Sequence, residues 1–397
     1  MSDRRISPGE FVALAALLIS LVAMAIDTML PALAEIGADF SVANANDTQL
    51  VVSAVFVGLT IAQFIFGPLS DSWGRKPTVY LGLLVFCVGC LVSIFANSFI
   101  VMLVGRVLQG IGAAAPKIVT VAIVRDQFKG AAMARIMSIV FSVFIVVPAL
   151  APAIGQGILY FAHWRAIFIF LLVQGAIALL WFTFRQPETL LPAARVPLSL
   201  RRIGRAALET CTNRRAIGYT LAAGLVFGAF LGYLTSAQQI FQVQYEVGAW
   251  FPVYFGGLAL SLGMATFLNS QMVLRFGMYR LALSALWALA LLSSAFLVPA
   301  IATGGTPPLW AFMCFMAPAF FCTGILFGNF NAMAMEPMGH IAGTAAAVIA
   351  SLSTLISLGL GVGIGRAFDG TILPLVIGMA ALSVLSLPIL YWVPRGK

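Results

Sequence analysis

The stretch FVALAALLISLVAMAIDTMLP at residues 11–31 decides the fold, and it contains a single charged residue, Asp27. At a rise of about 1.5 Å per residue, a helix of this length covers the ~30 Å hydrocarbon core of a bilayer. The run is too long for the apolar core of a signal peptide. We therefore expect it to remain in the protein as the first membrane-spanning helix.

Eleven further apolar runs of similar length follow along the chain. Over the whole sequence, 61% of residues are hydrophobic and only 9% are charged, whereas about 25% of residues are charged in a soluble domain. We therefore expect an all-α membrane protein with twelve transmembrane helices. The expected spans after the first are 48–68, 78–96, 99–124, 134–159, 164–185, 216–240, 250–274, 280–301, 308–335, 341–365 and 371–393.

The positive charges lie mainly in the short segments between the apolar runs. If the N-terminus is cytoplasmic, 18 of the 22 lysines and arginines lie in cytoplasmic segments, and only Arg165 and Arg366 lie on the opposite side. This asymmetry is typical of inner-membrane proteins. The net charge of +9 therefore indicates topology rather than nucleic-acid binding, which needs basic residues gathered on one solvated face. We expect a multi-pass protein of the bacterial inner membrane with both termini cytoplasmic.

The longest polar stretch, residues 186–215, contains three prolines and several arginines. A DNA-binding arm and a linker both fit such a run, but its place on the positive side, between six spans and six spans, favours a cytoplasmic linker. We therefore expect an N-terminal six-helix bundle at 1–185 and a C-terminal one at 216–397. Two such halves, with the substrate site near the bilayer midplane, are a common plan for secondary transporters.

The most specific short motif is GPLSDSWGRKP at residues 67–77, directly after the second expected span. Its glycines permit a tight turn, and its aspartate can accept hydrogen bonds from a helix N-terminus or a guanidinium. Such a charged lock can hold the cytoplasmic ends of two halves together in one state and release them in another. The alternative is a loop that only keeps positive charge inside. The pattern resembles the helix 2–3 loop of the major facilitator superfamily, with gate residues Gly67, Asp71, Gly74, Arg75 and Lys76.

Three further stretches narrow this resemblance: AIDTMLP at 25–31, GRVLQG at 105–110 and VPALAPAIG at 147–155. Together they resemble the Bcr/CflA-type drug-resistance transporters, a twelve-helix group of proton antiporters. The resemblance covers nearly the whole chain. It implies export of small molecules driven by the proton gradient, with no bound cofactor.

The third of these stretches predicts an irregular helix. Pro148, Pro152 and Gly155 permit a kink and close helix contact in a membrane. The stretch resembles a degenerate antiporter motif, in which the usual glycine before the first proline is Val147 here. This departure weakens the support that the motif gives to antiport.

Asp27 and Arg106 are the candidate proton-coupling pair. An ionisable group inside a span is costly and marks a functional site by default. Asp27 lies ~24 Å above the cytoplasmic edge of its helix, and Arg106 lies ~10 Å below the outer edge of its own, so their depths nearly coincide. Burial disfavours a charged carboxylate and a nearby guanidinium favours it, so small movements can change its protonation. We expect Asp27 to bind the coupling proton in competition with substrate; the alternative is a static ion pair.

Lys117 lies 11 residues after Arg106, on nearly the same helix face and about 16 Å nearer the cytoplasm. The related transporters usually have a small or apolar residue there. Two explanations remain open. The substrate is anionic or zwitterionic, because Arg106 and Lys117 outnumber Asp27, or the amine reaches the cytoplasmic headgroups or pairs with a loop acid.

Aromatic and neutral polar residues complete the candidate substrate site. An apolar, aromatic cavity with a few neutral polar groups suits amphiphilic ligands. Each residue alone is also a common helix-packing residue, because amides and hydroxyls bridge neighbouring helices. Together with Asp27, Arg106 and Lys117, the candidates are Gln109, Phe230, Tyr233, Gln238, Asn329 and Asn331.

Three classes of function are open to such a chain. The first is a proton-coupled exporter, and the second is a metabolite or nutrient importer or facilitator of the same fold. The third, a membrane-embedded enzyme or sensor, needs a clustered acid–base or metal constellation, whereas His163 and His340 lie apart at loop edges. We expect a monomer whose partners are a small-molecule substrate, protons and the lipid bilayer, with no nucleic acid, cofactor or metal.

Overall fold

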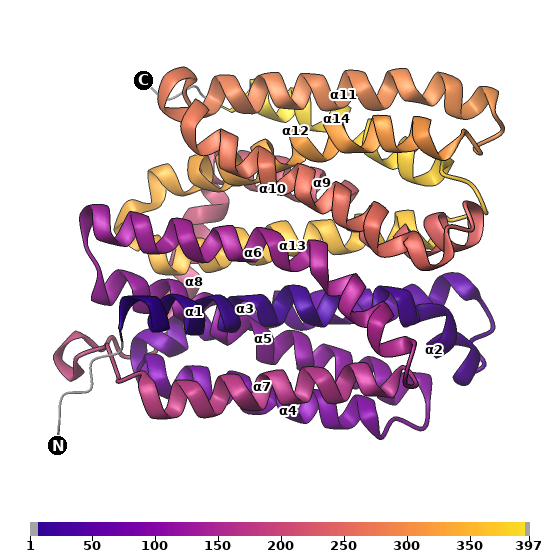
Figure 1. The fold of residues 1–397 in the computed structure, drawn as a ribbon. Coiled ribbons are helices and arrows are strands. Elements are labelled where there is room, and N and C mark those ends of the chain that lie inside the picture. Colours follow the sequence, from indigo (N-terminus) through magenta and orange to yellow (C-terminus); the bar gives the residue numbers. More distant parts are fainter. Residues whose placement is uncertain (1–6, 394–397) are drawn as a thin grey trace. The chain divides into compact units, whose positions relative to one another are not determined.

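The structure is a computed structural model that describes residues 7–393, and within this range it contains helices and turns but no strands (Figure 1). The α-helices of the first half are α1 (Pro8–Asp27), α2 (Leu33–Asp39), α3 (Leu50–Trp73), α4 (Arg75–Ile94), α5 (Phe99–Gln127), α6 (Gly130–Leu159) and α7 (Arg165–Arg185). Those that follow are α8 (Leu200–Thr212), α9 (Arg214–Leu234), α10 (Phe251–Phe276), α11 (Met278–Ala302), α12 (Leu309–Met335), α13 (Ala342–Arg366) and α14 (Leu373–Trp392). Short 3-10 helices lie at Leu30–Ala32, Ala45–Gln49, Pro192–Ala194, Gly248–Trp250 and Glu336–Ile341, and a π-helical turn at Gln239–Gln244.

Contacts between the helices divide the chain into two compact units. The first unit comprises Met1–Phe40 and Ala54–Ile203, and the second comprises Ser41–Ser53 and Gly204–Lys397. The segment Ser41–Ser53 therefore packs with the second unit, although it lies between helices of the first unit in the sequence. The expected linker at 186–215 contains the helix α8 as well as loop, and the division into halves at this stretch remains a prediction.

Ten segments of the described chain are long and apolar enough to cross a membrane. One of them, Leu309–Arg366, contains both α12 and α13, and α6 contributes Val146–Leu159 as a shorter apolar helix. Several helices agree closely with the expected spans. α7 corresponds to the expected span 164–185, and α13 corresponds to the expected span 341–365. The protein is therefore an all-helical, multi-pass membrane protein.

The first helix is shorter than the sequence predicts. α1 ends at Asp27, and a 3-10 turn at Leu30–Ala32 leads into α2, although the apolar segment continues from Pro8 to Asp39. Pro31 explains the break, because it has no N–H to bond the carbonyl of Asp27 and its ring crowds that carbonyl. Asp27 is therefore the last residue of its helix.

Local signals set several other helix ends. The hydroxyl of Ser98 accepts the backbone N–H of Val101 at 3.4 Å and caps the start of α5, and Asn213 caps α9 in the same way. Gly277 follows α10 with a φ of 80°, a conformation that favours glycine. Each of these signals marks a helix end, and short polar turns connect the long apolar helices.

Small residues bring α4 and α5 close together in the first unit. A Cβ on Gly89 would lie 2.6 Å from the backbone nitrogen of Gln109 and 2.8 Å from the carbonyl oxygen of Gly105. Such contacts are typical of membrane helices, where small side chains let backbones approach. α4 also packs against α7, as Figure 1 shows, and α1 contacts α5, α6 and α7. This packing places the middle of α5 against α1.

Candidate functional site

Arg106 is fully buried on α5, with no exposed surface. Its Nη1–H group donates to Oε1 of Gln109 at 2.5 Å, and its Nη2–H group donates to the carbonyl oxygen of Ala25 in α1 at 2.6 Å. Gln109 in turn donates to the hydroxyl of Ser93 on α4 at 3.2 Å. The guanidinium carbon lies 5.7 Å from the ring centre of Phe168 on α7. Side chains and backbone from three neighbouring helices thus hold the guanidinium in place.

Asp27 lies at the end of α1 and is 5% exposed. Among the residues that the structure describes, no hydrogen bond or ion pair involves its carboxylate. Arg106 reaches the same turn of α1 at Ala25, two residues earlier, but no ion pair joins Arg106 and Asp27 in this conformation. The carbonyl of Ala25 can accept from Arg106 because it lies in the last turn of α1, where backbone carbonyls lack partners within the helix.

Lys117 lies on α5 and is half-buried. α5 is one helix from Phe99 to Gln127, with Pro116 inside it, so the 11-residue spacing keeps Lys117 near the face of Arg106.

The irregular stretch of α6 packs against the end of α1. Pro148 and Pro152 lie inside α6, and a Cβ on Gly155 would collide with the carbonyl oxygen of Thr28. Thr28 directly follows Asp27. The glycine of the predicted kink therefore permits close contact of α6 with the chain beside the buried carboxylate.

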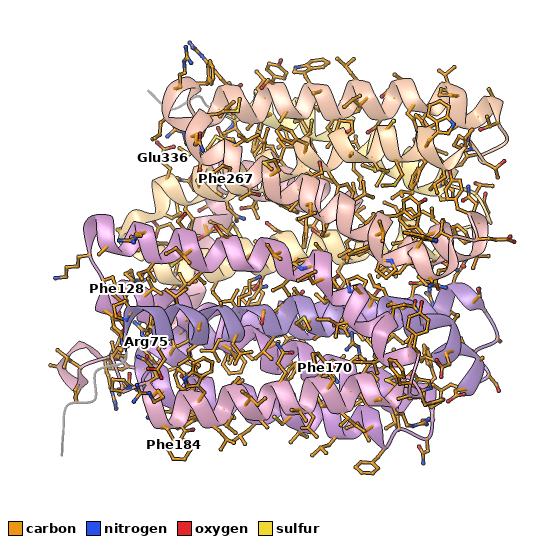
Figure 2. All side chains as sticks on the ribbon, in the orientation of Figure 1. Arg75, Phe128, Phe170, Phe184, Phe267 and Glu336 are labelled. Atoms are coloured by element: carbon orange, nitrogen blue, oxygen red, sulfur yellow. The ribbon has the colours of Figure 1, made fainter. Side chains whose placement is uncertain are left out.

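Arg75 is 4% exposed and forms the centre of an ionic network at the turn between α3 and α4. Its guanidinium donates to Asp71 at 2.5 Å, to the hydroxyl of Ser70 at 3.0 Å and to Asp126 at 2.9 Å. Figure 2 shows Arg75 at the same end of the first unit as Phe128, which follows α5. Sequence reasoning missed Asp126, whose position at the end of a span was the available signal.

Glu188, another residue that sequence reasoning missed, joins the linker to this network. Its carboxylate stands at the N-terminus of α4, where an anion is favoured. It accepts, at 2.9 to 3.0 Å, the four backbone N–H groups of Arg75, Lys76, Thr189 and Leu190. The proline-rich surroundings of Glu188 concealed this role in the sequence.

The remaining motif residues shape the turn itself. Gly74 has a φ of 117°, which favours glycine, and a Cβ there would meet the carboxylate of Glu188 at 2.5 Å. The carbonyl of Gly67 accepts the hydroxyl of Ser70 at 2.9 Å, and Nζ of Lys76 donates to the carbonyl of Thr183 at 3.0 Å. In the described part of the chain, the hydrogen-bond partners found for these motif residues lie in the first unit.

The second unit contains an aromatic cluster on α9 and its neighbours. Tyr233 is 1% exposed, and its ring lies 4.8 Å from that of Phe320 and 5.7 Å from that of Phe255. The ring of Phe230 lies 5.6 to 5.8 Å from the rings of Phe227, Phe320 and Phe327. Both candidate residues therefore take part in aromatic packing within this unit.

The two candidate asparagines of α12 differ in their surroundings. Asn329 is 2% exposed and donates to Oδ1 of Asn269 on α10 at 2.8 Å and to the carbonyl of Ile325 at 3.0 Å. Asn331 is exposed. Asn329 therefore bridges two helices, which is the packing role that competes with substrate contact.

A second polar cluster joins the segment Ser41–Ser53 to the end of α13, and sequence reasoning missed it. Oδ1 of Asp47 accepts from Nε and Nη2 of Arg366 at 3.0 and 2.6 Å. The amide of Asn46 donates to the carbonyls of Arg366 and Phe368 at 2.9 and 2.8 Å. Arg366 is one of only two basic residues expected on the side opposite to the cytoplasm, and this position was the signal in the sequence for the cluster.

The candidate Gln238 belongs to the same cluster. Its Oε1 accepts from Gln49 at 3.2 Å, and its amide donates to Gln242 at 3.1 Å. Gln239 donates to Oδ1 of Asn46 at 2.6 Å. Gln238 thus lies in a network of amides between the start of α3 and the chain after α9.

The fold and these buried polar groups define a class of protein. Long apolar helices enclose a carboxylate and a guanidinium. This arrangement is that of a membrane transporter. A family model described as Major Facilitator Superfamily matches residues 12–363, and the chain belongs to this family.

Curated relatives are similar over most of the chain. A bicyclomycin resistance protein homolog of Haemophilus influenzae is 30% identical over 92% of this chain and 92% of its own length. The MFS-type transporter YdgK of Bacillus subtilis is 31% identical over 83% and 82%, and multidrug resistance protein D of Escherichia coli is 26% identical over 85% and 84%. The resemblance to Bcr/CflA-type transporters is confirmed. Members of the superfamily are carriers of small molecules rather than enzymes, and they generally need no cofactor.

Two solved structures share the fold. The human organic anion transporter MFSD10 (TETRAN) has a TM-score of 0.70 at 18% identity, covering 98% of this chain and 100% of its own. A D-xylose–proton symporter has a TM-score of 0.74 at 14% identity, covering 97% and 98%. At these identities the similarity establishes the fold alone.

Proposed function

We propose that the protein is a proton-coupled secondary active exporter that exchanges protons for small amphiphilic molecules such as antibiotics or metabolites. It acts as a monomer in the bacterial inner membrane, with both termini cytoplasmic. Asp27 is its proton site, and Arg106 tunes the affinity of that site. The names of the resistance proteins from Haemophilus influenzae and Escherichia coli support the direction of transport.

The proposed topology has twelve spans. Dividing Leu309–Arg366 at the 3-10 turn Glu336–Ile341 yields two spans from one apolar segment, and the whole of α6 supplies another. The asymmetry of the lysines and arginines supports cytoplasmic termini. An even number of spans is required by termini on the same side.

The observation that carries the proposal is the buried carboxylate of Asp27, which no described protein group binds. An ionised carboxylate buried without a partner is costly, so the group is stable either as the neutral acid or beside a cation. A site that alternates between these two forms is what proton coupling requires.

Arg106 supplies the cation for the ionised form. Its Nη2–H group is bonded to the carbonyl of Ala25 at 2.6 Å, two residues before Asp27. When Asp27 loses its proton, the guanidinium can exchange this neutral carbonyl for the carboxylate, because charge-assisted hydrogen bonds are about twice as strong as neutral ones. Proton binding reverses the exchange, and a substrate that binds at Asp27 competes with the proton.

Alternating access needs parts that move as rigid bodies and contacts that open. The network of Arg75, with Gly67, Asp71, Gly74 and Lys76, supports the first need, since it joins the α3–α4 turn, the end of α5 and the start of the linker. The bond between Asp47 and Arg366 supports the second, because it is exposed and therefore weak. We propose that the Arg75 network stiffens the part of the first unit that forms the cytoplasmic gate, and that the Asp47–Arg366 bond breaks when the outer side opens.

The substrate contacts are proposed to include Gln109 and Lys117 as well as Asp27 and Arg106. In the second unit they include Phe230, Tyr233, Gln238, Asn329 and Asn331. The aromatic cluster of that unit supports ligands with a flat apolar body.

Inside-out membrane vesicles test the proposal. A respiration-energised vesicle accumulates protons, and a substrate of the exporter added outside releases them, which a pH-sensitive dye reports. Across a panel of antibiotics, the wild type should release protons with its substrates. Asp27→Asn, which keeps the shape but cannot ionise, should release none, and Asp27→Glu should retain part of the response.

The exposed Asp369, which lies in a loop, supplies a matched control, and Asp369→Asn should behave as the wild type. Proton release by Asp27→Asn equal to the wild type would remove Asp27 from the coupling step. Movement of substrate and protons in the same direction would show that the protein is an importer and not an exporter.

A further inference from the structure

We propose that the exposed face of the helix α8 binds the headgroups of anionic phospholipids at the cytoplasmic surface of the bilayer. Residues 201–215, which comprise most of α8 and the start of α9, contain five arginines and a single acid, Glu209. The inference goes beyond the transport cycle proposed above. It takes from that proposal only the assignment of this end of the second unit to the cytoplasm.

α8 lies at the end of a membrane-spanning helix. It ends at Thr212, and Asn213 alone separates it from α9, which is long and apolar enough to span the membrane. The side chain of Asn213 accepts the backbone N–H groups of Arg215 and Ala216 at 3.0 and 3.1 Å, so α9 begins directly after this residue. The C-terminal end of α8 is therefore close to the level at which α9 enters the bilayer.

Aromatic residues mark the same level independently of the charges on α8. The guanidinium carbon of Arg214 lies 4.5 Å from the ring centre of Trp392, and its Nη2–H group donates to the carbonyl oxygen of Trp392 at 2.6 Å. Trp392 is the last residue of α14 and is 47% exposed, and Tyr391 beside it is 53% exposed. Exposed tryptophan and tyrosine at the ends of spans are typical of the headgroup region. The junction of α8 and α9 therefore lies beside the headgroups.

One face of α8 is buried on the second unit. Ala206 is 4% exposed and Thr210 is fully buried, and the hydroxyl of Thr210 lies 3.9 Å from Sδ of Met338. Oε1 of Glu209 lies 2.5 Å from Nε2 of His340. Met338 and His340 belong to the 3-10 turn that connects α12 and α13. These contacts hold α8 against the ends of two further helices and bind its single acid.

The opposite face of α8 is exposed and basic. Arg201, Arg205, Leu208 and Thr212 follow one another at helical spacing along one continuous helix, and all four are exposed. Leu208 is 64% exposed, although it is a large apolar residue. A loop that only kept positive charge inside would not need an apolar side chain on its exposed face. A basic, amphipathic helix beside a span is instead typical of binding to anionic lipids.

The leucine favours a phospholipid over a soluble anion. A guanidinium binds the oxygens of a phosphate through two parallel hydrogen bonds, and inorganic phosphate supplies such oxygens as well as a lipid does. Inorganic phosphate would leave Leu208 in water, whereas the boundary between headgroup and acyl chain buries an apolar side chain. A phospholipid therefore matches both kinds of residue on this face. Each arginine near an anionic surface should increase the affinity about fivefold.

Hydrogen–deuterium exchange of the full-length protein in nanodiscs tests the proposal without substrate or a proton gradient. Discs of phosphatidylcholine are compared with discs that also contain anionic phosphatidylglycerol, which is present on both faces of the disc. The backbone amides of wild-type α8 should exchange at least about fivefold more slowly in the anionic discs, which is the contribution of one arginine. Arg201→Gln/Arg205→Gln should abolish this difference. Arg201→Lys/Arg205→Lys should retain most of it, and Leu208→Ser should reduce it without a change of charge.

Arg275 and Arg280, which are exposed at the turn between α10 and α11, supply the matched control. Arg275→Gln/Arg280→Gln removes the same charge elsewhere and should leave the difference in α8 unchanged. Equal exchange of wild-type α8 in the two kinds of disc would overturn the proposal, and so would an unchanged difference in Arg201→Gln/Arg205→Gln.

Two additions to phosphatidylcholine discs separate the lipid from other anions. Equal slowing of α8 by inorganic phosphate would show that a soluble anion is sufficient. Equal slowing by polyglutamate would indicate an acidic protein partner. Either result would overturn the assignment to a lipid. Because no transport is measured, failure in these discs leaves the proposed function intact, and failure of proton exchange in vesicles leaves the lipid site intact.

Discussion

Glu188 is predicted to fasten the linker to the first turn of α4. In Glu188→Gln the Oε2 atom that accepts the backbone N–H of Lys76 at 3.0 Å becomes an NH2 group, which cannot accept, while Oε1 can still accept from Arg75. The loss of one hydrogen bond to a charged group costs roughly 1.5 kcal/mol at a half-exposed site. The loss of a negative charge at a helix N-terminus adds about 0.5 kcal/mol. Together these amount to about 2 kcal/mol, or about a 30-fold change in the equilibrium for local opening.

Hydrogen–deuterium exchange of the purified protein measures this opening directly. The backbone amides of Arg75, Lys76, Thr189 and Leu190 should exchange about 30-fold faster in the variant, because exchange follows the population of the open form. Glu209→Gln is the matched control, since Glu209 contacts His340 elsewhere and its loss should leave these four amides unchanged. Equal exchange rates in Glu188→Gln and the wild type would refute the assigned role.

Two other contacts yield predictions of stability. Gly155→Ala should lower the free energy of unfolding by about 1–3 kcal/mol, because its Cβ would collide with the carbonyl of Thr28, whereas Gly157→Ala should have little effect, since nothing lies within 4 Å of a Cβ there. Thermal unfolding in detergent compares the two, and equal midpoints would contradict the close packing of α6 on α1. Asn46→Asp should destabilise the protein more than Asp47→Asn in the same assay, because an acceptor-only carboxylate would face two carbonyls, while Asp47 takes part in an exposed ion pair worth at most about 1 kcal/mol. The reverse order would show that the ion pair dominates this cluster.

The spans could be predicted because lipid demands long apolar helices and leaves a strong signal. Their ends were harder to predict where a proline interrupts an apolar run. Residues 11–31 appear as one helix in the hydropathy pattern, yet Pro31 ends α1 at Asp27. The grouping of Ser41–Ser53 with the second unit depends on hydrogen bonds of Asn46 and Asp47, which no periodicity reports.

The sequence identified candidate residues of the site, but it did not identify the groups to which they bond. The depths of Asp27 and Arg106 pointed to one level of the membrane, and Arg106 does reach α1 close to Asp27. Its acceptor, the carbonyl of Ala25, became available only because the helix ends early. Glu188 could not be assigned from sequence, because a glutamate in a proline-rich stretch gives no sign of the helix N-terminus that it meets in the fold.

The central claim is that substrate and proton compete for one carboxylate. The most direct measurement is proton release on binding, recorded with a pH indicator in a weakly buffered solution of the purified protein to which chloramphenicol or ciprofloxacin is added. If the proton weakens substrate binding, the substrate must weaken proton binding by the same factor. We predict release of about one proton per protein from the wild type and none from Asp27→Asn. Undiminished release from Asp27→Asn, or substrate binding to the wild type without any release, would contradict the account.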